Sequence, residues 1–224
     1  MNITTEILLS VCYKNKLHPT RAEKIAKHLT GICPLYGINN ADIMHEFLAN
    51  LLHECDEFTR YEESLNYSAE ALISKFGRHR ISEADAWRYG RTREHPADQK
   101  RIANTIYGGK WGKENLGNVF ENDGFDFRGS GPIQGTGRAN ITQFAMYMEK
   151  TFTLKKTPEQ WAEQLRTSDE YGIHFACWIF AISKKLIDEA INDLMETIVK
   201  RINGGLLGLD DRMKYYDLCK KFIV

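Results

Sequence analysis

The stretch LLHECDEFTRYEESLNYSAE, residues 51–70, places six carboxylates around a single histidine and a single cysteine. Glu54 stands at the end of an apolar helical pattern, and Glu63 follows nine residues later in a polar loop. Two carboxylates in unlike surroundings can act as the general acid and the general base of glycoside hydrolysis. An inverting enzyme holds the two groups about 6.5–9.5 Å apart, so that a water molecule fits between them. The same spacing also fits an ordinary solvated acidic loop.

Glu54 belongs to a clearly patterned helix, which we expect over 41–56. Asn40 is the expected N-cap, and an apolar stripe follows one face of the helix, formed by Ile43, Met44, Phe47, Leu48, Leu51, Leu52 and Cys55. At about 100° per residue, Glu54 falls within the arc of this stripe, while His53 points away from it. A carboxyl group buried there without a close cation would stay protonated, as a general acid requires. A glutamate that reaches solvent or pairs with an arginine is the alternative.

Motifs for other chemistries are missing or incomplete. HECDE, residues 53–57, lacks the second histidine of the zinc motif HExxH, because position 57 is Glu. Neither GxSxG nor GxxxxGK[ST] occurs, and the glycines of GSGPIQGTG do not match a dinucleotide-binding turn. We therefore expect no metal site, no nucleotide site and no serine nucleophile, and an enzyme that needs no cofactor.

Helical patterns dominate the rest of the chain. We expect helices over 4–13, 20–29, 41–56, 68–76, 83–88, 97–106, 139–149, 158–166, 169–185, 188–201 and 210–222. The glycine-rich stretches YGGKWGKENLGN and NDGFDFRGSGPIQGTGR are expected to be loops that permit close approach. Phe125 and Phe127 alternate around Asp126, which predicts a short β element there. The predicted class is mainly α with at most a small β lobe, in a single domain spanning residues 1–224.

Composition argues against several classes of partner. The 224 residues include 30 Lys and Arg and 30 Asp and Glu, a net charge of +0, so we expect neither nucleic acid nor an anionic membrane as a partner. The most apolar segment, YGIHFACWIFAISKKLI, is too short to span a bilayer and is expected to be a buried core helix. The five cysteines are scattered, and the start MNITTEILLSVCYKNK shows no export signal. We expect reduced thiols and a chain made in the cytoplasm.

Four sequence blocks resemble glycoside hydrolase family 19, and within it the phage endolysin branch rather than the plant chitinases. In order they are FLANLLHEC with the following EESLNYSAEAL, then HPADQKRIANTIYGGKWGKENLGN, DGFDFRGSGPIQGTGRANITQF and VKRINGGLLGLDDRMKYY. Together they cover about residues 30–216. The resemblance implies an α+β, lysozyme-like fold in which a helical domain and a small β-hairpin lobe have a cleft between them.

The resemblance also implies roles for particular residues. Glu54 corresponds to the family's general acid and Glu63 to its general base, with Glu62 as the rival for the second role. Thr136 corresponds to the residue that helps to hold the attacking water. The expected substrate-binding residues are Tyr67, Gln134, Asn140, Asn203 and Arg212, and the arginine is also expected to tune the charge of the acid.

Three places depart from the family pattern. Cys55, Asp56 and Glu57 follow the acid where the family often has Ser-Gly-Gly. Ser130 stands where an arginine is usual, and Gly135 replaces an aliphatic residue. These changes bear on the conformation of the loops and on the register of a bound sugar chain, and they leave the candidate acid and base in place.

Two further groups of residues have both a structural and a functional interpretation. Any of the four tryptophans could stack on a sugar ring, but Trp178 is expected in the core, and only for Trp111, in a glycine-rich stretch, is this interpretation as good as the structural one. Arg78, His79 and Arg80 are most simply a solvated turn, with contact to an anionic wall polymer as the alternative.

Together these observations predict an enzyme that hydrolyses the β-1,4 glycosidic bonds of peptidoglycan with inversion. The missing plant-type insertions and disulfides favour peptidoglycan over chitin. A chitinase of the same mechanism and a catalytically silent glycan-binding or interaction protein are the alternatives. We expect a monomer whose partner is the glycan strand, acting on the cell wall or in the periplasm after release. A phage enzyme would depend on a holin or a secretion partner, and a bacterial effector on an immunity protein.

Overall fold

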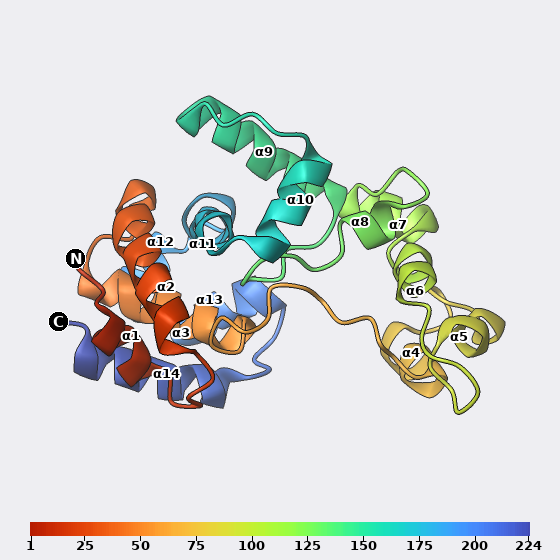
Figure 1. The fold of residues 1–224 in the computed structure, drawn as a ribbon, viewed down its shortest axis with the longest axis horizontal. Helices are drawn as coiled ribbons and strands as arrows, with labels where there is room; N and C mark the ends of the chain where they lie inside the picture. Colours follow the sequence, from red (N-terminus) through yellow and green to blue (C-terminus); the bar gives the residue numbers. More distant parts are fainter. The chain divides into compact units, whose positions relative to one another are not determined.

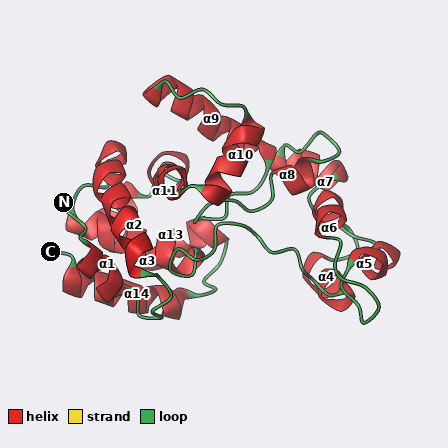
Figure 2. Ribbon diagram, in the orientation of Figure 1, coloured by secondary structure: helices red, strands yellow, loops and turns green.

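The computed structural model describes all residues, 1–224, and is built almost entirely from helices (Figure 1, Figure 2). In chain order these are α1 (Thr5–Val11), α2 (Pro19–Ile32), the 3-10 helix η1 (Cys33–Tyr36), α3 (Ala41–Glu54), α4 (Ala69–Phe76), α5 (Glu83–Tyr89), α6 (Gln99–Ile106), α7 (Gly109–Leu116), α8 (Asp123–Asp126), α9 (Arg138–Phe152), α10 (Pro158–Thr167), α11 (Asp169–Cys177), the π-helix η2 (Trp178–Ser183), α12 (Ile187–Ile191), α13 (Met195–Asn203) and α14 (Leu209–Phe222). Extended segments form only isolated bridges, such as that between Ser130 and Gly135. The mainly helical class is confirmed.

The β element expected around Phe125 and Phe127 is wrong. Asp123–Asp126 forms the short helix α8, in which Phe125 N–H donates to Asn122 O at 3.0 Å. The Asp123 carboxylate braces the turn that leads into this helix, because it accepts from the Val119 N–H at 2.8 Å. Alternation over three residues is too short a signal to separate a strand from a helical turn.

The glycine-rich stretch YGGKWGKENLGN was expected to be a loop, and this expectation is wrong, because most of the stretch forms helix α7. Gly112 is buried in this helix, and a Cβ atom there would lie 1.9 Å from the carbonyl oxygen of Tyr107. Glycine here permits a close approach of two backbone segments instead of a flexible loop. Gly117, with a φ of 67°, then ends the helix.

Two long helices expected near the C-terminus are interrupted. The helix expected over 169–185 is α-helical only to Cys177 and continues as π-helical turns over Trp178–Ser183. The helix expected over 188–201 is divided into α12 and α13 near Asp193, whose φ of 53° breaks the right-handed path. The Asp193 carboxylate accepts from the Tyr216 hydroxyl at 2.7 Å, and this contact holds the break against α14.

The chain divides into two compact units, each described by itself. Unit 1 comprises Met1–Tyr61, Gly131–Gln134 and Gln164–Val224, and unit 2 comprises Glu62–Ser130 and Gly135–Glu163. Compact units of this kind can belong to one folding domain, so the single-domain expectation stays a prediction.

Unit 1 is organised around α3 and α14, which are distant in the sequence and pack side by side (Figure 1). Asn40 caps α3, since its Oδ1 accepts from the Ile43 N–H at 3.0 Å, as the sequence predicts. Every α3 residue from Ile43 to Leu52 is buried. Helix α2 packs on α11, and α1 lies against both α2 and α14. The enclosed helix α3 therefore delivers its last residue, Glu54, to the edge of a packed core.

Unit 2 has its own core, to which α4, α5 and α6 contribute. Its buried members are Leu65, Leu72, Phe76, Ile81, Ala86, Ile102, Ala103 and Ile106. Each of the three helices begins with a capping side chain, Ser68, Ser82 or Asp98, whose oxygen accepts from a backbone N–H of the first turn. Helix α8 packs on α6, and α7 contacts α9.

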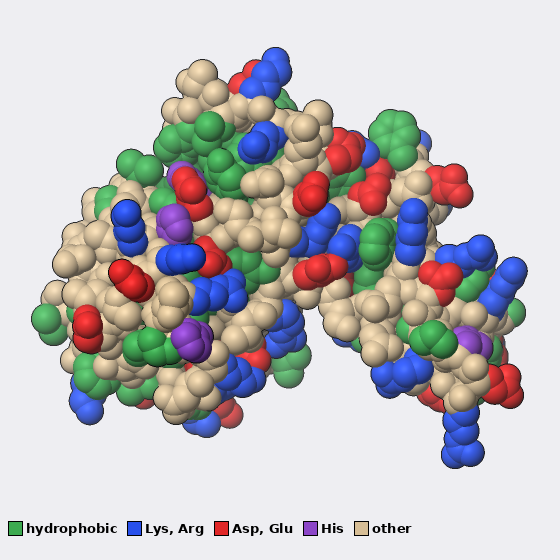
Figure 3. Space-filling model, viewed as in Figure 1, with side chains coloured by type: hydrophobic (Ala, Val, Ile, Leu, Met, Phe, Trp, Pro, Cys, Tyr) green, Lys and Arg blue, Asp and Glu red, His purple; other side chains and the backbone are tan.

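Both signs of charge are interspersed over the face of the molecule drawn in Figure 3. This mixture agrees with the net charge of +0. No helix combines the length and the apolar composition that crossing a membrane requires.

Candidate active site

Glu54 ends helix α3 with its carboxylate at the edge of the unit 1 core. Its side chain keeps 17% of its surface exposed, whereas the side chain of its partner Arg212, on α14, is completely buried. Arg212 Nη2 donates to Glu54 Oε1. Since a guanidinium is costly to bury without a carboxylate, this ion pair fixes Glu54 in place.

Two asparagines complete the surroundings of the ion pair. The Asn203 amide, oriented so that each of its atoms meets a complementary partner, donates to Glu54 Oε1 at 3.0 Å and accepts from Arg212 Nη2 at 2.5 Å. Arg212 Nη1 donates to Asn50 Oδ1 at 3.2 Å. Both hydrogen bonds to Glu54 thus fall on Oε1, and Oε2 accepts none.

The sequence left two interpretations of Glu54 open: a buried carboxyl group without a close cation, or a carboxylate that reaches solvent or pairs with an arginine. The structure shows the pairing with an arginine. The carboxylate does not lie in an apolar pocket without a close cation, because Arg212 is in direct contact with it. Arg212 and Asn203, two residues that the family resemblance assigns to the cleft, both lie beside Glu54.

His53 takes part in a second polar contact between α3 and α14. Its Nδ1 lies 2.6 Å from Asp211 Oδ2, and the same carboxylate accepts from the Tyr13 hydroxyl and from Lys14 Nζ, the latter at 3.0 Å. Burial alone would raise the pKa of Asp211, but these hydrogen bonds outweigh it and lower the pKa to about 2. Asp211 is therefore ionised at neutral pH, and its contact with His53 joins the end of α3 to α14.

Gly208 allows α14 to begin directly against His53. Its φ is 78°, and a Cβ atom at this position would lie 2.4 Å from His53 Nε2. The Arg212 N–H donates to Gly208 O at 3.1 Å, so the helical turn that carries Arg212 begins at this contact. A side chain at position 208 would therefore strain the backbone and force the His53 ring to move from this contact.

The turn after α3 contains two residues that replace the family's usual glycines. Asp56 and Glu57 have φ values of 50° and 58°, a left-handed conformation that glycine adopts most readily. Glu57 is completely buried, and its carboxylate accepts from the N–H groups of Lys14 and Lys16 at 2.7 and 2.8 Å. Lys16 also forms an ion pair with Asp56. Contacts with the N-terminal segment thus fix the conformation of this turn, although it lacks the family's usual glycines.

Glu63 lies in unit 2, where both of its carboxylate oxygens are held by neutral donors. Oε1 accepts from the Tyr107 hydroxyl at 2.7 Å, and Oε2 accepts from the Gly129 N–H at 3.2 Å. The Glu63 N–H donates in turn to Gly129 O at 2.9 Å. Burial and the charge of Glu63 raise the pKa of Tyr107, so the phenol remains a donor. These contacts hold the carboxylate in one orientation.

The neighbouring Glu62 has a different kind of partner. Its Oε1 accepts from Nε and Nη2 of Arg128 at 2.9 and 2.5 Å, and its side chain is 53% exposed. The Arg128 guanidinium also lies over the Phe125 ring, 3.9 Å from its centroid. Glu62 is thus engaged by a cation, whereas Glu63 is engaged by a phenol and a backbone N–H.

Tyr107 contacts Glu63, and Arg80 lies over the Tyr107 ring, although no sequence pattern placed either residue beside the candidate base. The Arg80 guanidinium carbon lies 5.3 Å from the Tyr107 ring centroid and 3.7 Å from that of Trp111. Burial lowers the pKa of Arg80, while Tyr107 and Glu63 oppose this effect. The interpretation of residues 78–80 as a solvated turn is therefore wrong for Arg80. No local pattern marks it, because two of the rings that it contacts, those of Tyr107 and Trp111, are distant in the sequence.

The predicted site residues Gln134, Thr136 and Asn140 have contacts that shape the glycine-rich loop and the start of α9. Gln134 has a φ of 53°, and its Nε2 donates to Gly131 O at 3.0 Å. Asn140 Nδ2 donates to Thr136 O at 2.8 Å, which braces the first turn of α9. The structure assigns Gln134 to unit 1 and the other two to unit 2.

The two remaining departures from the family, Ser130 and Gly135, close this loop by pairing with each other. The Ser130 N–H donates to Gly135 O and the Gly135 N–H donates to Ser130 O, each at 3.0 Å. Ser130 is completely buried, and its hydroxyl donates to Arg128 O at 2.8 Å. A small residue at each position therefore suits a narrow, backbone-paired neck.

Tyr67 belongs to the aromatic group of unit 2. Its hydroxyl accepts from Lys75 Nζ at 2.7 Å, and its ring meets Phe76 edge-on with centroids 5.4 Å apart. Phe76 also meets the ring of Tyr107, so Tyr67 is connected to the surroundings of Glu63 through one side chain. The structure thus brings Asn203 and Arg212 to Glu54 in unit 1, and Tyr67 near Glu63 in unit 2.

Comparison with known proteins identifies the family. No protein-family model matches the chain. A protein of Haemophilus influenzae, described as a glycosyl hydrolase family 19 domain-containing protein, is 30% identical over 210 residues. The match covers 94% of this chain and 94% of the relative, so the similarity extends over nearly the full length of both. The chain belongs to glycosyl hydrolase family 19.

Proposed function

We propose that the chain is an endolysin-like hydrolase that cleaves β-1,4 glycosidic bonds of peptidoglycan with inversion. Membership of glycosyl hydrolase family 19 supports glycoside hydrolysis in general. The four blocks that resemble the phage endolysin branch support peptidoglycan as the substrate. In this proposal Glu54 is the general acid, Glu63 is the general base, and Thr136 holds the attacking water with Glu63.

The observation that carries the proposal is the way in which Glu54 is held. Arg212 and Asn203 both bind Oε1, which leaves Oε2 to donate a proton to the leaving oxygen. A general acid must present its proton within hydrogen-bond reach of the leaving group and in one orientation. Arg212 is therefore a positioning residue in this proposal, because it acts through Glu54.

The proposed base is Glu63 rather than Glu62 because of their partners. Glu62 would have to break its ion pair with Arg128 before it could activate water. Glu63 is oriented by Tyr107 and Gly129, and neither contact supplies a competing charge. The proposed substrate-binding residues are Tyr67, Gln134, Asn140 and Asn203.

Digestion of purified peptidoglycan tests the proposal. Mass spectrometry of the released fragments identifies the bond that is cut, and NMR of the first product is expected to show the α anomer, the result of inversion at a β bond. A β anomer formed first would exclude inversion. Fragments from chitin with an intact wall would favour a chitinase, and no fragments from either polymer would favour a glycan-binding protein.

We also propose that the protein acts as a monomer at the cell wall after release from the cytoplasm, with the glycan strand as its partner. A reaction carried by two carboxyl groups needs no cofactor. Light scattering of the purified protein and its activity after dialysis against a chelator test these two statements. A stable dimer, or activity restored only by a metal ion, would contradict them.

A further inference from the structure

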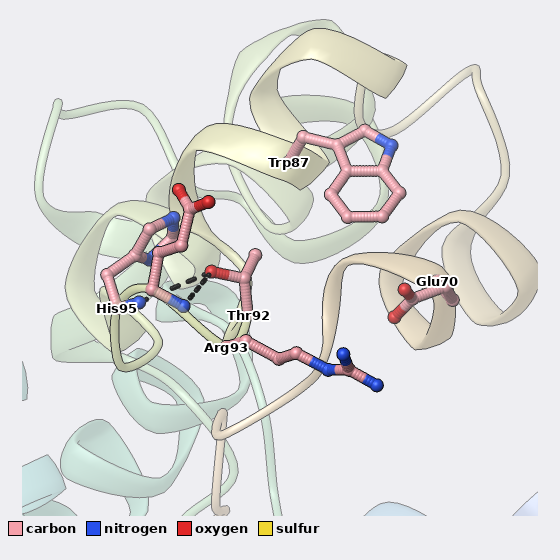
Figure 4. Close-up of a pocket in the computed structure, with 6 residues that line it drawn as sticks. Glu70, Trp87, Thr92, Arg93 and His95 are labelled. Atoms are coloured by element: carbon pink, nitrogen blue, oxygen red, sulfur yellow. Dashed lines mark hydrogen bonds between the residues drawn. The ribbon is translucent and has the colours of Figure 1, made fainter.

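A hollow of about 510 Å³ lies on unit 2, lined by Glu70, Trp87, Thr92, Arg93, Glu94 and His95 (Figure 4). Its volume falls within the range of about 300–1,000 Å³ that is usual for small-ligand sites. The lining comes from α4, α5 and the loop that follows α5. None of these residues belongs to the proposed hydrolytic site.

Trp87 is the side chain of this hollow that packing does not explain. It is 47% exposed, whereas the neighbouring aromatic residues of unit 2 pack on the core, namely Tyr67, Phe76, Tyr89, Tyr107 and Phe125. In α5 the core-facing residue is Ala86, and Trp87 projects about 100° away from it around the helix. The half-exposed indole therefore offers a flat apolar face and an N–H donor to a ligand.

Hydrogen bonds within the loop hold it in one conformation. Thr92 Oγ1 accepts from the N–H groups of Glu94 and His95 at 3.1 and 3.3 Å (Figure 4). The Thr92 N–H donates to His95 O at 3.0 Å. The loop that borders the hollow is therefore closed by its own backbone and needs no ligand to form.

The ends of the loop are fastened to the core of unit 2. The Arg91 N–H donates to Tyr67 O, and the Asp98 N–H donates to Tyr89 O, each at 2.8 Å. Gly90 lets the start of the loop lie close to α4, because a Cβ atom at this position would lie only 2.7 Å from Ala69 N. A ligand of this hollow would meet a preformed wall, which lowers the entropic cost of binding.

The charges of the lining narrow the class of ligand. Glu70 and Glu94 contribute two carboxylates against the single guanidinium of Arg93, so a phosphate-rich or carboxylate-rich polymer would be repelled. Arg93 and Glu94 form no ion pair within the chain, and in Figure 4 Arg93 and the indole of Trp87 border the hollow from opposite sides. A flat apolar face with donors and acceptors around it matches a neutral pyranose ring, which has an apolar C–H face and polar hydroxyls at its rim.

We propose that this hollow is a second glycan-binding site, in which Trp87 stacks on a pyranose ring of an N-acetylated glycan chain. The inference rests on the proposed function, because it takes the substrate to be a glycan polymer. A second contact with the same polymer raises the effective concentration of the bond to be cut. The benefit is therefore confined to polymers and absent for short oligosaccharides.

Binding is tested by NMR of the indole N–H groups in the Glu54→Gln protein, with the N-acetylglucosamine tetrasaccharide as the probe. The Trp87 signal is identified by its loss in Trp87→Ala, and it is expected to shift saturably. Trp161 and Trp178 are buried and serve as internal references. In the variants, the backbone N–H signals of Thr92, Glu94 and His95, which also line the hollow, report binding. Trp87→Ala is expected to weaken this binding about tenfold or more, whereas Trp87→Phe keeps an aromatic face and most of the affinity.

Activity is tested in the protein with Glu54 intact. Trp87→Ala is expected to lower kcat/KM about tenfold on insoluble polymer through KM, and to leave turnover of a short oligosaccharide unchanged. Met146→Ala is the matched control, since Met146 is a 66% exposed apolar residue elsewhere on unit 2. Circular dichroism of each variant establishes that it is folded.

The possible failures are distinguishable. A Trp87 signal that stays fixed while the protein cuts polymer would exclude the second site and leave the proposed function intact. A Trp87 signal that shifts although no polymer is cut would keep the sugar site and reject the proposed hydrolysis. A shift caused by free stem peptide but not by the oligosaccharide would overturn the assignment to a pyranose ring.

Discussion

Arg212 is completely buried while its partner Glu54 keeps an exposed edge, so this ion pair joins the core of unit 1 to its surface. The guanidinium is enclosed where α14 packs on α3, and it also contacts Asn50 within the core. The orientation of the Glu54 carboxylate is therefore determined by helix packing rather than by a flexible loop.

Glu54→Gln is expected to lower kcat by about 10²–10⁴-fold and to preserve the fold. The amide oxygen can still accept from Arg212, but the side chain has no acidic proton to give. Glu54→Ala instead leaves the buried Arg212 without its carboxylate partner, and is expected to lower the free energy of unfolding by about 3–5 kcal/mol. Wall-digestion kinetics and urea unfolding measure the two effects, with the exposed Glu23→Gln on α2 as the control. Near-normal turnover by Glu54→Gln would remove Glu54 from the acid role.

Glu63→Ala is expected to lose most activity and to recover part of it in added azide. Azide can replace the water that the base activates, and the product then has inverted configuration. Glu62→Ala is the matched control, because it removes the adjacent carboxylate and its ion pair with Arg128. An inactive Glu62→Ala protein beside a nearly normal Glu63→Ala protein would reverse the assignment.

Thr136→Val is expected to impair the same step as Glu63→Ala, so the losses in the double variant should not add. Removing either partner already releases the water that both are proposed to hold. Single-turnover rates of the two single variants and the double variant measure the coupling. Fully additive losses would show that Thr136 acts elsewhere.

Glu46 gives unit 1 a specific pH dependence. It is completely buried on α3, and neither of its carboxylate oxygens takes a hydrogen bond. Burial raises the pKa of Glu46 to about 8; the charge of Asp193 adds to this effect and that of Lys220 opposes it. The ordinary value is 4.5, so between these two pH values the unfolded chain ionises while the folded chain keeps its proton.

This difference should lower stability as the pH rises from about 4.5 to about 8, by up to about 1.4 kcal/mol per pH unit, and have no effect below that window. Glu46→Gln is expected to remove the decline, and Glu23→Gln to retain it. Urea unfolding at several pH values measures both variants. Equal slopes in the wild type and Glu46→Gln would contradict the raised pKa.

Glu57→Ala is expected to lower the free energy of unfolding by about 2–4 kcal/mol, because it removes the buried carboxylate that accepts from the N–H groups of Lys14 and Lys16. Asp56→Ala is the matched control. Asp56 has the same left-handed backbone, but its side chain takes part only in partly exposed ion pairs with Lys14 and Lys16, so the expected effect is below about 1 kcal/mol. Similar losses in the two variants would show that backbone strain, not hydrogen bonding, dominates this turn.

The cysteines are expected to be free thiols. All five are buried and unpaired, although the sulfurs of Cys33 and Cys177 lie only 3.7 Å apart. Thiol titration of denatured, unreduced protein is expected to find about five thiols, and a value below about four would contradict this prediction.

Local patterns predicted the parts of the fold that depend on local interactions. The cap at Asn40 and the apolar stripe of α3 are encoded within one helix, and both are present in the structure. The helix at Gly109–Leu116 was not predictable in this way, because Gly112 is required by contact with the backbone at Tyr107. Composition alone cannot distinguish a glycine that bends a loop from one that packs a helix.

The candidate site likewise contains residues that the sequence could predict and residues that only tertiary packing reveals. The family resemblance pointed to Arg212, but only the structure shows that it is completely buried and that Asn203 contacts both Arg212 and Glu54. Tyr107 and Arg80 escaped notice because their contact with the surroundings of Glu63 depends on tertiary packing. Spacing along the chain carries no signal for such contacts.

Unit 1 is assembled from three separate stretches of the chain, and α14 comes from the last of them. During synthesis on the ribosome, α3 emerges long before the helix that it packs against, and nearly all of unit 2 is translated in between. Glu54 therefore has no Arg212 to hold it until α14 has been made. With Glu54 in its proposed role as the general acid, the nascent chain should remain inactive throughout elongation, and activity should begin only after translation of α14.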